Sequence, residues 1–334
     1  MENKGSCKVC VTGGAGYIGS FLVQLLLQNG YIVHATLRNL GDESKVGLLK
    51  SFPFAEERLH LFKADIYNPE EFEEAIQGCV YVFHVATPLF HTTGYKEIAD
   101  ACIPSGTVKR LIYTASVSAA SPLKEDGSGY KTIIDKSCWT PLHLDVPYTN
   151  YFLKVCIRNL KMFLRYLWTT QEAKTKSEQE ALKIGEDTAN KLEVVTLCCG
   201  LMGGGIVRSG SPSVFVSQIS NDMMQYQPLR YLEELLGKVP IVHIDDVCQA
   251  HIFCAETPSV NGRFLCASSF VSSAEMAKHY QRSYPQLKQE YLEERGIEIK
   301  WGSRKIEDKG FAYKYSTEMI LDDCLECAKR SGIV

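Results

Sequence analysis

The sequence predicts an α/β fold, in which a doubly wound parallel sheet is followed by a smaller, less regular C-terminal region. Short β-branched runs alternate with helical patterns, and a glycine-rich loop joins the first run to the first helix. Apolar residues make up 45% of the 334 and charged residues 22%, with a formal net charge of −3. This composition excludes a disordered or collagen-like chain, and it argues against a general nucleic-acid binder, which needs excess positive charge.

Five runs in the first half are typical of buried strands, since they are rich in β-branched and aromatic residues. They lie at 8–12, 31–37, 59–63, 81–85 and 109–114. Helical patterns lie between them, at 16–28, around 69–77 and around 95–103. The first helix has four leucines available to its buried side: Leu22, Leu25, Leu26 and Leu27. Strand, helix and strand at this spacing indicate βαβ units with parallel strands.

The segment between the first strand and the first helix is the strongest motif. It reads Thr12-Gly13-Gly14-Ala15-Gly16-Tyr17-Ile18-Gly19. The first glycine permits the tight turn, the second lets the backbone approach a pyrophosphate, and the third lets helix and strand pack closely. The helix N-terminus favours the negative phosphates. We predict a Rossmann-type dinucleotide site formed by Thr12, Gly13, Gly16, Tyr17, Ile18 and Gly19.

The residues after the second strand indicate which dinucleotide is bound. An NAD site would place Asp or Glu there to bind the ribose hydroxyls. This chain has Arg38, whose fork of donors suits a 2′-phosphate, and Lys45 adds a second positive charge. We therefore predict NADPH rather than NADH. Asp65 and Ile66, after the third strand, are placed to meet the adenine edge, unless Asp65 simply caps the next helix.

Later strands are predicted at 193–198, 239–244 and 263–266. We expect a dinucleotide-binding domain over residues 1–199, with the strands near 239–244 and 263–266 as candidates to return to it. Residues 200–334 mix loops, helices and short strands, and we expect them to form a smaller substrate region.

The chain carries no export or membrane signal of the usual kinds. No apolar run approaches the roughly 20 residues that span a bilayer, and residues 1–6 lack the apolar stretch of a signal peptide. The 13 cysteines are therefore interpreted as free thiols in a reducing compartment. We expect a cytoplasmic protein.

Five further segments narrow the interpretation. They are His84-Val85-Ala86-Thr87-Pro88, the run from Val108 to Val117, Cys138-Trp139-Thr140-Pro141-Leu142, the run from Cys199 to Gly204, and His243-Ile244-Asp245-Asp246-Val247. With the TGxxGxxG loop, they resemble the extended short-chain dehydrogenase/reductase group, in its plant dihydroflavonol 4-reductase branch near anthocyanidin reductase and vestitone reductase. The resemblance covers nearly the whole chain. It implies NADPH-dependent reduction of a carbonyl or conjugated system in a phenolic, flavonoid-like substrate.

The resemblance also implies a catalytic Ser, Tyr and Lys. The Tyr protonates the forming alkoxide, the Lys lowers the Tyr pKa and holds the nicotinamide ribose, and the Ser hydrogen-bonds the substrate carbonyl. Ser116 matches the Ser, with Ser118 as a local rival, and Lys174 matches the Lys. The resemblance places further residues beside the cofactor, namely Val85, Ala86 and Thr87. The implied substrate pocket draws on Thr87, Pro88, Leu201, Met202 and the 205–230 loops.

The tyrosine of the family's Tyr-x-x-x-Lys pattern is missing. Thr170 stands four residues before Lys174, and its hydroxyl is a far weaker acid than a phenol. Among the 17 tyrosines only Tyr284 precedes a lysine by four residues, and it lies far down the chain. The activity of the chain is therefore open. Three local tyrosines are alternatives without supporting spacing: Tyr148, Tyr151 and Tyr166.

Two segments depart from the family pattern. Residues 156–173 replace a much shorter connection before the lysine, and the run 156–168 is apolar with interspersed cations. It is either an amphipathic helix that docks on a membrane surface or partner, or the product of an unspliced intron or wrong gene model, which we favour. Between Lys96 and Glu97 the family carries more helical residues. We therefore expect a short crossover helix there, which leaves apolar surface poorly covered.

Other constellations carry less weight. Cys7-x-x-Cys10 and Cys324-x-x-Cys327 resemble half zinc sites, but they lie too far apart in sequence, and we predict no metal. Cys10 is expected in the core, and the second pair on a terminal helix. His243 followed by Asp245 suggests a His–carboxylate dyad, but we expect Asp245 to cap a helix instead.

The sequence thus predicts an NADPH-dependent reductase of a small phenolic carbonyl compound, with Ser116 and Lys174 in place and no metal or nucleic-acid partner. Two alternatives stay open. One is a non-catalytic NADP-binding relative, and the other is an epimerase or dehydratase of the same fold. Retention of bound dinucleotide through purification would favour the epimerase, because that enzyme recycles its nucleotide.

Overall fold

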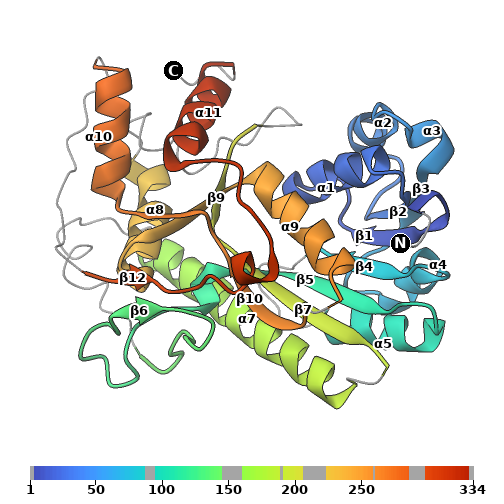
Figure 1. Ribbon diagram of the computed structural model, residues 1–334, viewed down its shortest axis with the longest axis horizontal. Coiled ribbons are helices and arrows are strands. Elements are labelled where there is room, and N and C mark those ends of the chain that lie inside the picture. Colours follow the sequence, from blue (N-terminus) through green and yellow to red (C-terminus); the bar gives the residue numbers. More distant parts are fainter. Residues whose placement is uncertain are drawn as a thin grey trace. The chain divides into compact units, whose positions relative to one another are not determined.

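The computed structural model describes residues 4–86, 95–144, 160–188, 191–205, 223–258, 260–285 and 298–330. Its elements are shown in Figure 1. The chain divides into two compact units. The first comprises 1–115, 176–197 and 247–264, and the second comprises 116–175, 198–246 and 265–334.

A seven-stranded sheet forms the centre of the fold, with the order β10-β7-β5-β4-β1-β2-β3. Its strands are β1 (Lys8–Thr12), β2 (Ile32–Leu37), β3 (Leu59–Lys63), β4 (Tyr81–His84), β5 (Arg110–Ser116), β7 (Glu193–Cys199) and β10 (Gly262–Cys266). The pairings of β1 with β2 and β4, of β2 with β3, and of β4 with β5 are all parallel. The predicted α/β class with a doubly wound parallel sheet is confirmed.

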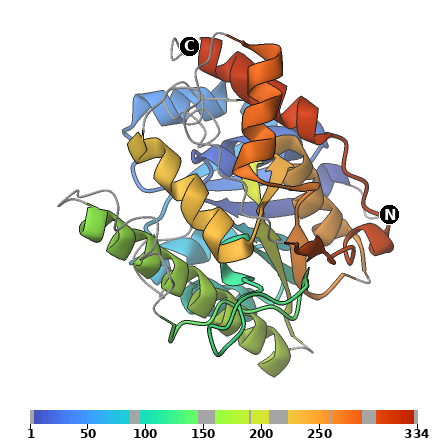
Figure 2. The same cartoon turned by 90° about the vertical axis from the view of Figure 1, so that its left-hand side faces the viewer.

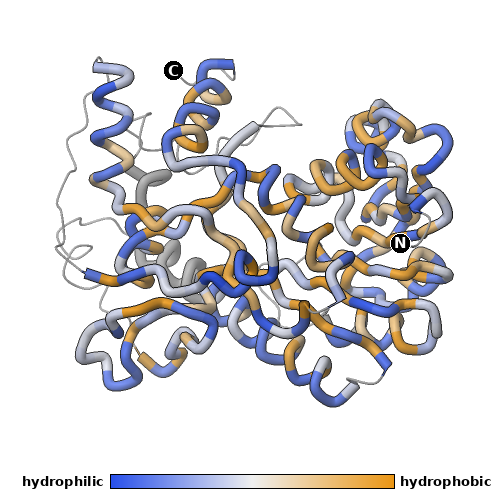
Figure 3. Tube along the Cα trace, viewed as in Figure 1, coloured by the Kyte–Doolittle hydropathy of each residue, from blue (hydrophilic) through white to orange (hydrophobic). Residues whose placement is uncertain are grey.

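The strands form here because both faces of the sheet are covered, so that nearly every side chain must be apolar. In β1 four consecutive residues are buried, and in β5 the first six are. Figure 3 shows hydrophobic colour along these strands. Cys10 is fully buried in β1, as expected. The chain runs outward from β1 through β2 to β3, then returns to β4 on the other side, so the topological switch point lies between β1 and β4.

Helices connect the parallel strands, and α1 and α5 lie on opposite sides of β1 and β4 in Figure 1. The helical elements of this part are η1 (Lys4–Ser6), α1 (Tyr17–Gln28), α2 (Glu43–Lys50), α3 (Ala55–Arg58), η2 (Pro69–Phe72), α4 (Glu73–Ile76), α5 (Tyr95–Ser105) and α9 (Ile244–Glu256). Asp42 begins α2, because its carboxylate accepts the N–H of Lys45 at 3.1 Å. The crossover helix α5 has 11 residues and contains Pro104.

Helix α7 (Leu160–Asp187) runs without interruption for 28 residues, as Figures 1 and 2 both show. Its first half is the latter part of the inserted segment, so the backbone of residues 160–168 is helical, in line with one of the two interpretations of that segment. The expected contact of 156–168 with a membrane or partner stays a prediction, since residues 156–159 and the side chains of 160–168 lie outside the described part.

The remaining elements form smaller sheets and three helices. Strands β8 (Leu201–Gly203), β9 (Val239–His243) and β11 (Ser269–Val271) form a sheet in the order β11-β9-β8, and β6 (Ile133–Ile134) pairs with β12 (Lys300–Trp301). The helical elements are η3 (Val117–Ala119), α8 (Met223–Leu236), α10 (Ser273–Ser283), η5 (Glu307–Lys309) and α11 (Thr317–Arg330). Thus β10 joins the large sheet, whereas β9 joins a separate one. The domain boundary at residue 199 stays a prediction.

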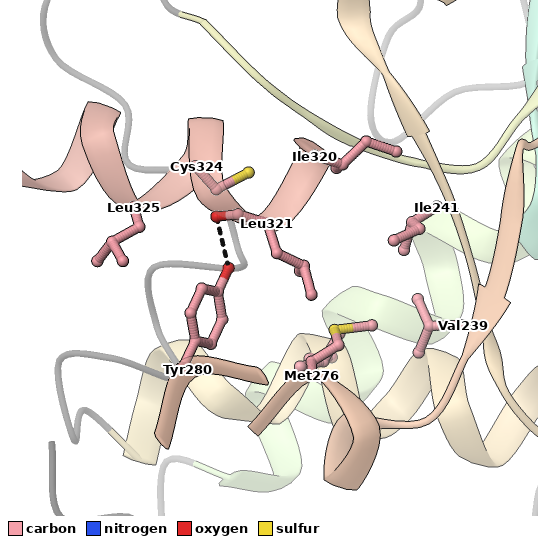
Figure 4. Close-up of a cluster of buried hydrophobic side chains, with 9 residues drawn as sticks. Val239, Ile241, Met276, Tyr280, Ile320, Leu321, Cys324 and Leu325 are labelled. Carbon is pink, nitrogen blue, oxygen red and sulfur yellow. Dashed lines mark hydrogen bonds between the residues drawn. The ribbon is translucent and has the colours of Figure 1, made fainter. Parts of the chain in front are cut away.

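A cluster of apolar side chains from α8, β9, α10 and α11 forms the core of the second unit (Figure 4). Its members are Leu229, Val239, Ile241, Met276, Tyr280, Ile320, Leu321, Cys324 and Leu325. The Tyr280 hydroxyl donates to the Leu321 carbonyl at 3.3 Å, so its polar atom is satisfied inside the cluster. Each large apolar side chain buried here stabilises the fold by roughly 1.5–3 kcal/mol.

The twelve cysteines that the structure describes are all buried and free of disulfide bonds. Among the described residues, no group of His, Cys, Asp and Glu is arranged to hold a metal ion. None of the described helices combines the length and hydrophobicity that a bilayer span requires.

Candidate functional site

The glycine turn between β1 and α1 has the shape of a phosphate cradle. Gly13 has φ +67°, a left-handed conformation that favours glycine. A Cβ on Gly19 would lie only 2.3 Å from the Gly13 carbonyl oxygen, so only glycine lets helix and turn approach this closely. The Gly13 N–H donates to Thr36 Oγ1 at 3.2 Å, and the Gly14 N–H donates to the Thr36 carbonyl at 3.0 Å. These two hydrogen bonds therefore fix the turn against β2.

The N-terminus of α1 is suited to an anion. Its N-cap residue, Gly16, offers no side-chain hydrogen bond, and the first turn of the helix contains no acidic residue. The helix dipole and the N–H groups of the first turn then favour a negative ligand. Tyr17 and Ile18 belong to this first turn, and Tyr17 is 39% exposed. The residues present fit the pyrophosphate of a dinucleotide.

Thr12 joins the ends of β1 and β4 at the switch point. Its hydroxyl oxygen accepts the N–H groups of Val85 and Ala86, both at 3.1 Å. The Thr12 hydroxyl also lies 2.9 Å from Nδ1 of His84, which is its acceptor because the oxygen already takes two N–H donors. The structure therefore brings Thr12, Val85 and Ala86 together with the glycine turn. Thr87 lies outside the described residues.

Among the residues predicted to meet the adenosine half of the cofactor, Arg38 and Asp65 follow β2 and β3, which are neighbours in the sheet, and Lys45 lies in α2. Arg38 is exposed directly after β2. Lys45 forms an ion pair with Asp42 at 2.7 Å. Asp65 accepts the N–H of Tyr67 at 3.1 Å through Oδ1. No acidic side chain stands at the position after β2 where an NAD site would carry one.

Ser116 is the last residue of β5, and its hydroxyl is oriented by Ser118. The Ser116 oxygen accepts the backbone N–H of Ser118 at 3.2 Å and its hydroxyl at 2.9 Å. Since a serine hydroxyl has one proton of its own, that proton is left for another acceptor. Ser118 thus supports Ser116. The Ser118 carbonyl in turn accepts the Thr140 hydroxyl at 2.6 Å.

Lys174 lies on α7, one turn after Thr170, and is partly exposed. Burial lowers the pKa of its ammonium group to about 8, and the nearby Cys199 thiol opposes this shift. Cys199 ends β7, whose neighbour in the sheet is β5 with Ser116 at its end. The carboxyl edge of parallel strands is where α/β proteins bind ligands.

The spacing of residues along α7 does not place Tyr166 where Thr170 lies, one turn before Lys174. Tyr166 lies eight residues before Lys174, which is about 12 Å along a helix axis. Tyr148 and Tyr151 lie outside the described residues. Two other phenols approach this part of the second unit. The Tyr231 hydroxyl on α8 donates to the side chain of Gln171.

Tyr313 is the second of these phenols. Burial raises the pKa of its hydroxyl, and the charges of Cys266 and Cys199 act in the same direction. It therefore lies near Cys266 and Cys199, which end β10 and β7. Neither Tyr231 nor Tyr313 has a spacing signal in the sequence, because both come from elements remote from α7 along the chain.

A buried ion pair anchors α7 to the sheet, and no motif in the sequence predicts it. Glu178 is fully buried, and its two oxygens each accept from Arg263 on β10 at 3.0 Å. The Thr196 hydroxyl on β7 donates to the same carboxylate at 2.8 Å. Such a bidentate ion pair fixes both the position of the helix and its rotation about its own axis.

The expectation that Asp245 caps α9 is wrong. The Asp245 N–H instead donates to Nδ1 of His243 at 3.1 Å, so the imidazole satisfies the first turn. His243 Nε2 lies 3.2 Å from the Asp323 carboxylate. Burial lowers the pKa of His243, and Asp323 opposes the shift. The neighbouring Asp246 accepts two backbone N–H groups, of Lys314 and of the residue after it, and so ties down the C-terminal segment.

The Cys324-x-x-Cys327 pair on α11 is structural. Cys324 accepts the Gly204 N–H at 3.3 Å, and the Cys327 thiol donates to the Gly204 carbonyl at 3.5 Å. The two thiols thus hold the backbone just after β8.

Fold and glycine turn together define a Rossmann-type dinucleotide-binding protein. Residues 5–126 match the model of the NmrA-like family. Vestitone reductase of Medicago sativa is 33% identical over 99% of both chains, and a putative anthocyanidin reductase of Ginkgo biloba is 33% identical over 98% of this chain and 95% of its own. The crystal structure of the alfalfa vestitone reductase superposes with a TM-score of 0.77 at 32% identity, covering 98% of this chain and 99% of that one.

The chain therefore belongs to the plant reductase family of vestitone reductase, anthocyanidin reductase and dihydroflavonol 4-reductase, and the resemblance seen in the sequence is confirmed. Its members are oxidoreductases named for small-molecule substrates.

Proposed function

We propose that the chain is an NADPH-dependent reductase of a carbonyl group in a flavonoid-like or related phenolic substrate. The observation that carries the proposal is the phosphate cradle beside β2, whose end presents the exposed Arg38 where an NAD site carries an acid. Family membership supports the reductase chemistry and the substrate class. The cytoplasmic location expected from the sequence stays a prediction.

Binding is assigned to the first unit. The turn from Thr12 to Gly19 would hold the pyrophosphate, with Arg38 and Lys45 on the 2′-phosphate and Asp65 and Ile66 at the adenine edge. Lys45 would exchange its ion pair with Asp42 for the phosphate, which carries more charge. Just after β4, Val85, Ala86 and Thr87 would line the cofactor site. These roles follow the family motifs, and the open helix terminus of α1 is what supports them here.

The chemistry is assigned to Ser116 and Lys174. When bound, the reduced nicotinamide would supply a hydride to the substrate carbonyl carbon. The free proton of Ser116 would hydrogen-bond the carbonyl oxygen and stabilise the negative charge that develops there. Lys174 would hold the nicotinamide ribose and place a positive charge near the same oxygen. Thr170 replaces the phenol that completes this set in the family.

A non-catalytic NADP-binding protein is the second candidate, and Thr170 is the observation that favours it. Such a protein would keep the cradle and Arg38 but turn over no substrate. An alkyl hydroxyl at this position does not donate a proton at neutral pH, whereas removal of a positioned acid costs typically 10²–10⁴-fold in rate.

The test is NADPH oxidation with a panel of dihydroflavonols, anthocyanidins and isoflavanones. The unaltered chain is compared with a version in which residues 156–173 are replaced by Tyr-Thr-Lys-Ser, which restores the family pattern before Lys174. The proposal expects turnover by the repaired version with at least one class, and NADPH binding by both proteins. Binding without turnover by either protein would support the non-catalytic candidate, and absence of binding would exclude both candidates.

A further inference from the structure

We propose that a pocket at the amino edge of the seven-stranded sheet, where its parallel strands begin, binds a small molecule that carries a phosphate monoester on an apolar body. The pocket lies within the first unit, beside the first residues of β4, β5 and β7 and the end of α9. Its volume is about 420 Å³, which is in the range of small-molecule sites. The glycine turn follows β1 at the opposite, carboxyl edge of the same sheet, so the two sites are separate.

Backbone hydrogen bonds bring the beginnings of these strands to one level. The Lys109 N–H donates to the Val80 carbonyl at 2.9 Å, and the Glu193 N–H donates to the Lys109 carbonyl at 3.0 Å. Neighbouring strands lie about 4.8 Å apart, so Lys109 and Lys191, which is two residues before Glu193, stand next to each other along this edge. Both lysines are exposed and line the pocket.

Arg110 forms the floor of the pocket. It is only 4% exposed, and its guanidinium donates to the Glu193 carboxylate through Nε at 2.8 Å and also through Nη2. Its Nη1 donates to the carbonyls of Cys254, Ala255 and Thr257 at 2.6, 3.1 and 2.9 Å. These carbonyls belong to the C-terminal end of α9, whose partial negative charge would repel an anion. The buried guanidinium compensates that charge and holds the floor in a fixed shape.

The two carboxylates that line the pocket are both bound by other side chains of the same unit. Glu193 forms its ion pair with Arg110. Glu256 Oε1 accepts the Tyr31 hydroxyl at 2.5 Å and lies 2.5 Å from the Lys4 ammonium group. The negative charge of each carboxylate is therefore compensated, and neither one opposes an anionic ligand strongly.

The pocket has an excess of positive charge. Three cations line it, namely Lys109, Arg110 and Lys191, and Lys4 binds one of its two carboxylates. Four cations thus stand against two carboxylates, and a dianion matches this excess better than a carboxylate or a sulfate ester does. A phosphate monoester carries about −1.5 to −2 charges at pH 7 and offers three acceptor oxygens. The two exposed lysines are placed to bind it from the rim.

The rest of the lining suits the carbon part of a ligand. Leu192 and Ala255 are buried in the wall, Tyr81 is half-buried, and Pro258 is exposed at the rim. Small-molecule sites typically combine such apolar surface with a few polar groups that fix the orientation of the ligand. Inorganic phosphate alone would leave this apolar surface in contact with water, so a phosphate ester fits the pocket better than the bare ion.

The first experiment compares phenyl phosphate with phenyl sulfate by calorimetric titration of the full chain. The two probes have nearly the same shape, but at about pH 7.5 phenyl phosphate is a dianion and phenyl sulfate carries a single charge. We expect one molecule of phenyl phosphate to bind with a dissociation constant at least about tenfold below that of phenyl sulfate, because each additional charged hydrogen bond strengthens binding. Equal affinities, or no binding of phenyl phosphate, would overturn the inference.

The second experiment locates the binding site with lysine variants. Lys191→Gln and Lys109→Gln should each weaken the binding of phenyl phosphate by about tenfold. Lys183→Gln is the matched control, since it removes the same charge from an exposed lysine of the same unit outside the pocket. It should keep the affinity within about twofold, because salt screens exposed charges outside the site. An equal loss in Lys183→Gln would show general charge attraction and would contradict the pocket.

A third comparison separates this pocket from the proposed cofactor site, because the glycine turn also suits a phosphate. Arg38→Gln should leave the affinity for phenyl phosphate within about twofold, and Lys191→Gln should leave the affinity for NADPH unchanged within the same limit. If Arg38→Gln weakens phenyl phosphate binding and Lys191→Gln does not, the probe occupies the cofactor site. The inference then fails, while the reductase assignment stands.

Discussion

At the scale of single residues, the proposed cofactor site depends on a missing side chain at Gly19 and on a missing acid at position 38. Gly19 must lack a side chain, because a Cβ there would meet a backbone oxygen rather than a flexible side chain that can move aside. Arg38 stands where an acid would repel a 2′-phosphate.

Gly19→Ala should weaken NADPH binding by at least tenfold and lower the free energy of unfolding by about 1–3 kcal/mol, since the backbone of the turn must shift. The measurement is a fluorescence titration together with a thermal melt. Gly47→Ala is the matched control. An added Cβ at Gly47 meets nothing within 4 Å, and the position lies inside helix α2, so alanine should stabilise it by about 0.5–1 kcal/mol. Equal effects of the two substitutions would contradict the cradle.

Arg38→Gln should weaken NADPH binding by about tenfold or more and leave NADH binding nearly unchanged, because a charged hydrogen bond contributes about 1.5–3 kcal/mol. Both dissociation constants are measured by titration at one salt concentration. Arg304→Gln, an exposed arginine of the other unit, should alter neither value. If Arg38→Gln weakens the binding of NADPH and NADH equally, Arg38 does not recognise the 2′-phosphate.

At the scale of elements, α7 carries Lys174 and depends on one buried carboxylate. We expect Glu178→Gln to lower the free energy of unfolding by about 3 kcal/mol, because Arg263 is then left buried without its counter-ion. Urea unfolding of this variant is compared with Glu186→Gln, an exposed position on the same helix that should change stability by less than about 0.5 kcal/mol. A stable Glu178→Gln variant would show that packing alone holds α7.

The elements also show what the sequence predicts well. Strands β1 to β5 and the glycine turn follow from short-range patterns, because burial on both faces makes the strands continuously apolar and the turn needs glycine at fixed spacing. The ion pair between Glu178 and Arg263 joins residues 85 positions apart, and no local pattern reports such a contact. The capping of α9 was misjudged for a related reason. Asp is a residue type favoured at helix N-termini, and only the three-dimensional structure shows that the His243 imidazole accepts the Asp245 N–H instead.

At the scale of the whole molecule, buried histidines couple stability to pH. His251 is fully buried, with Nδ1 on the Val247 carbonyl at 2.7 Å and Nε2 on the Thr114 hydroxyl at 2.7 Å. Burial lowers its pKa to about 4, from 6.5 in a free chain. The unfolded chain therefore takes up the proton first as pH falls, so stability is complete above about pH 6.5 and declines towards pH 4.

The loss between pH 6.5 and pH 4 should reach about 3 kcal/mol from His251 alone, at 1.36 kcal/mol per pKa unit. Burial lowers the pKa of His34 and His243 as well, so both add to the decline in the same direction. Urea unfolding at several pH values measures the slope. In His251→Gln the slope should be visibly reduced. An unchanged slope would show that other groups cause the acid sensitivity.

The most direct test of the reductase assignment follows the hydride itself. Protein is incubated with NADPH that carries deuterium at the transferable position of the nicotinamide, together with an isoflavanone or dihydroflavonol, and the product is analysed by mass spectrometry. The assignment predicts an alcohol that has gained one deuterium and an equal amount of oxidised cofactor. A product without deuterium, formed with no net oxidation of the cofactor, would contradict it and indicate the epimerase or dehydratase chemistry of the same fold.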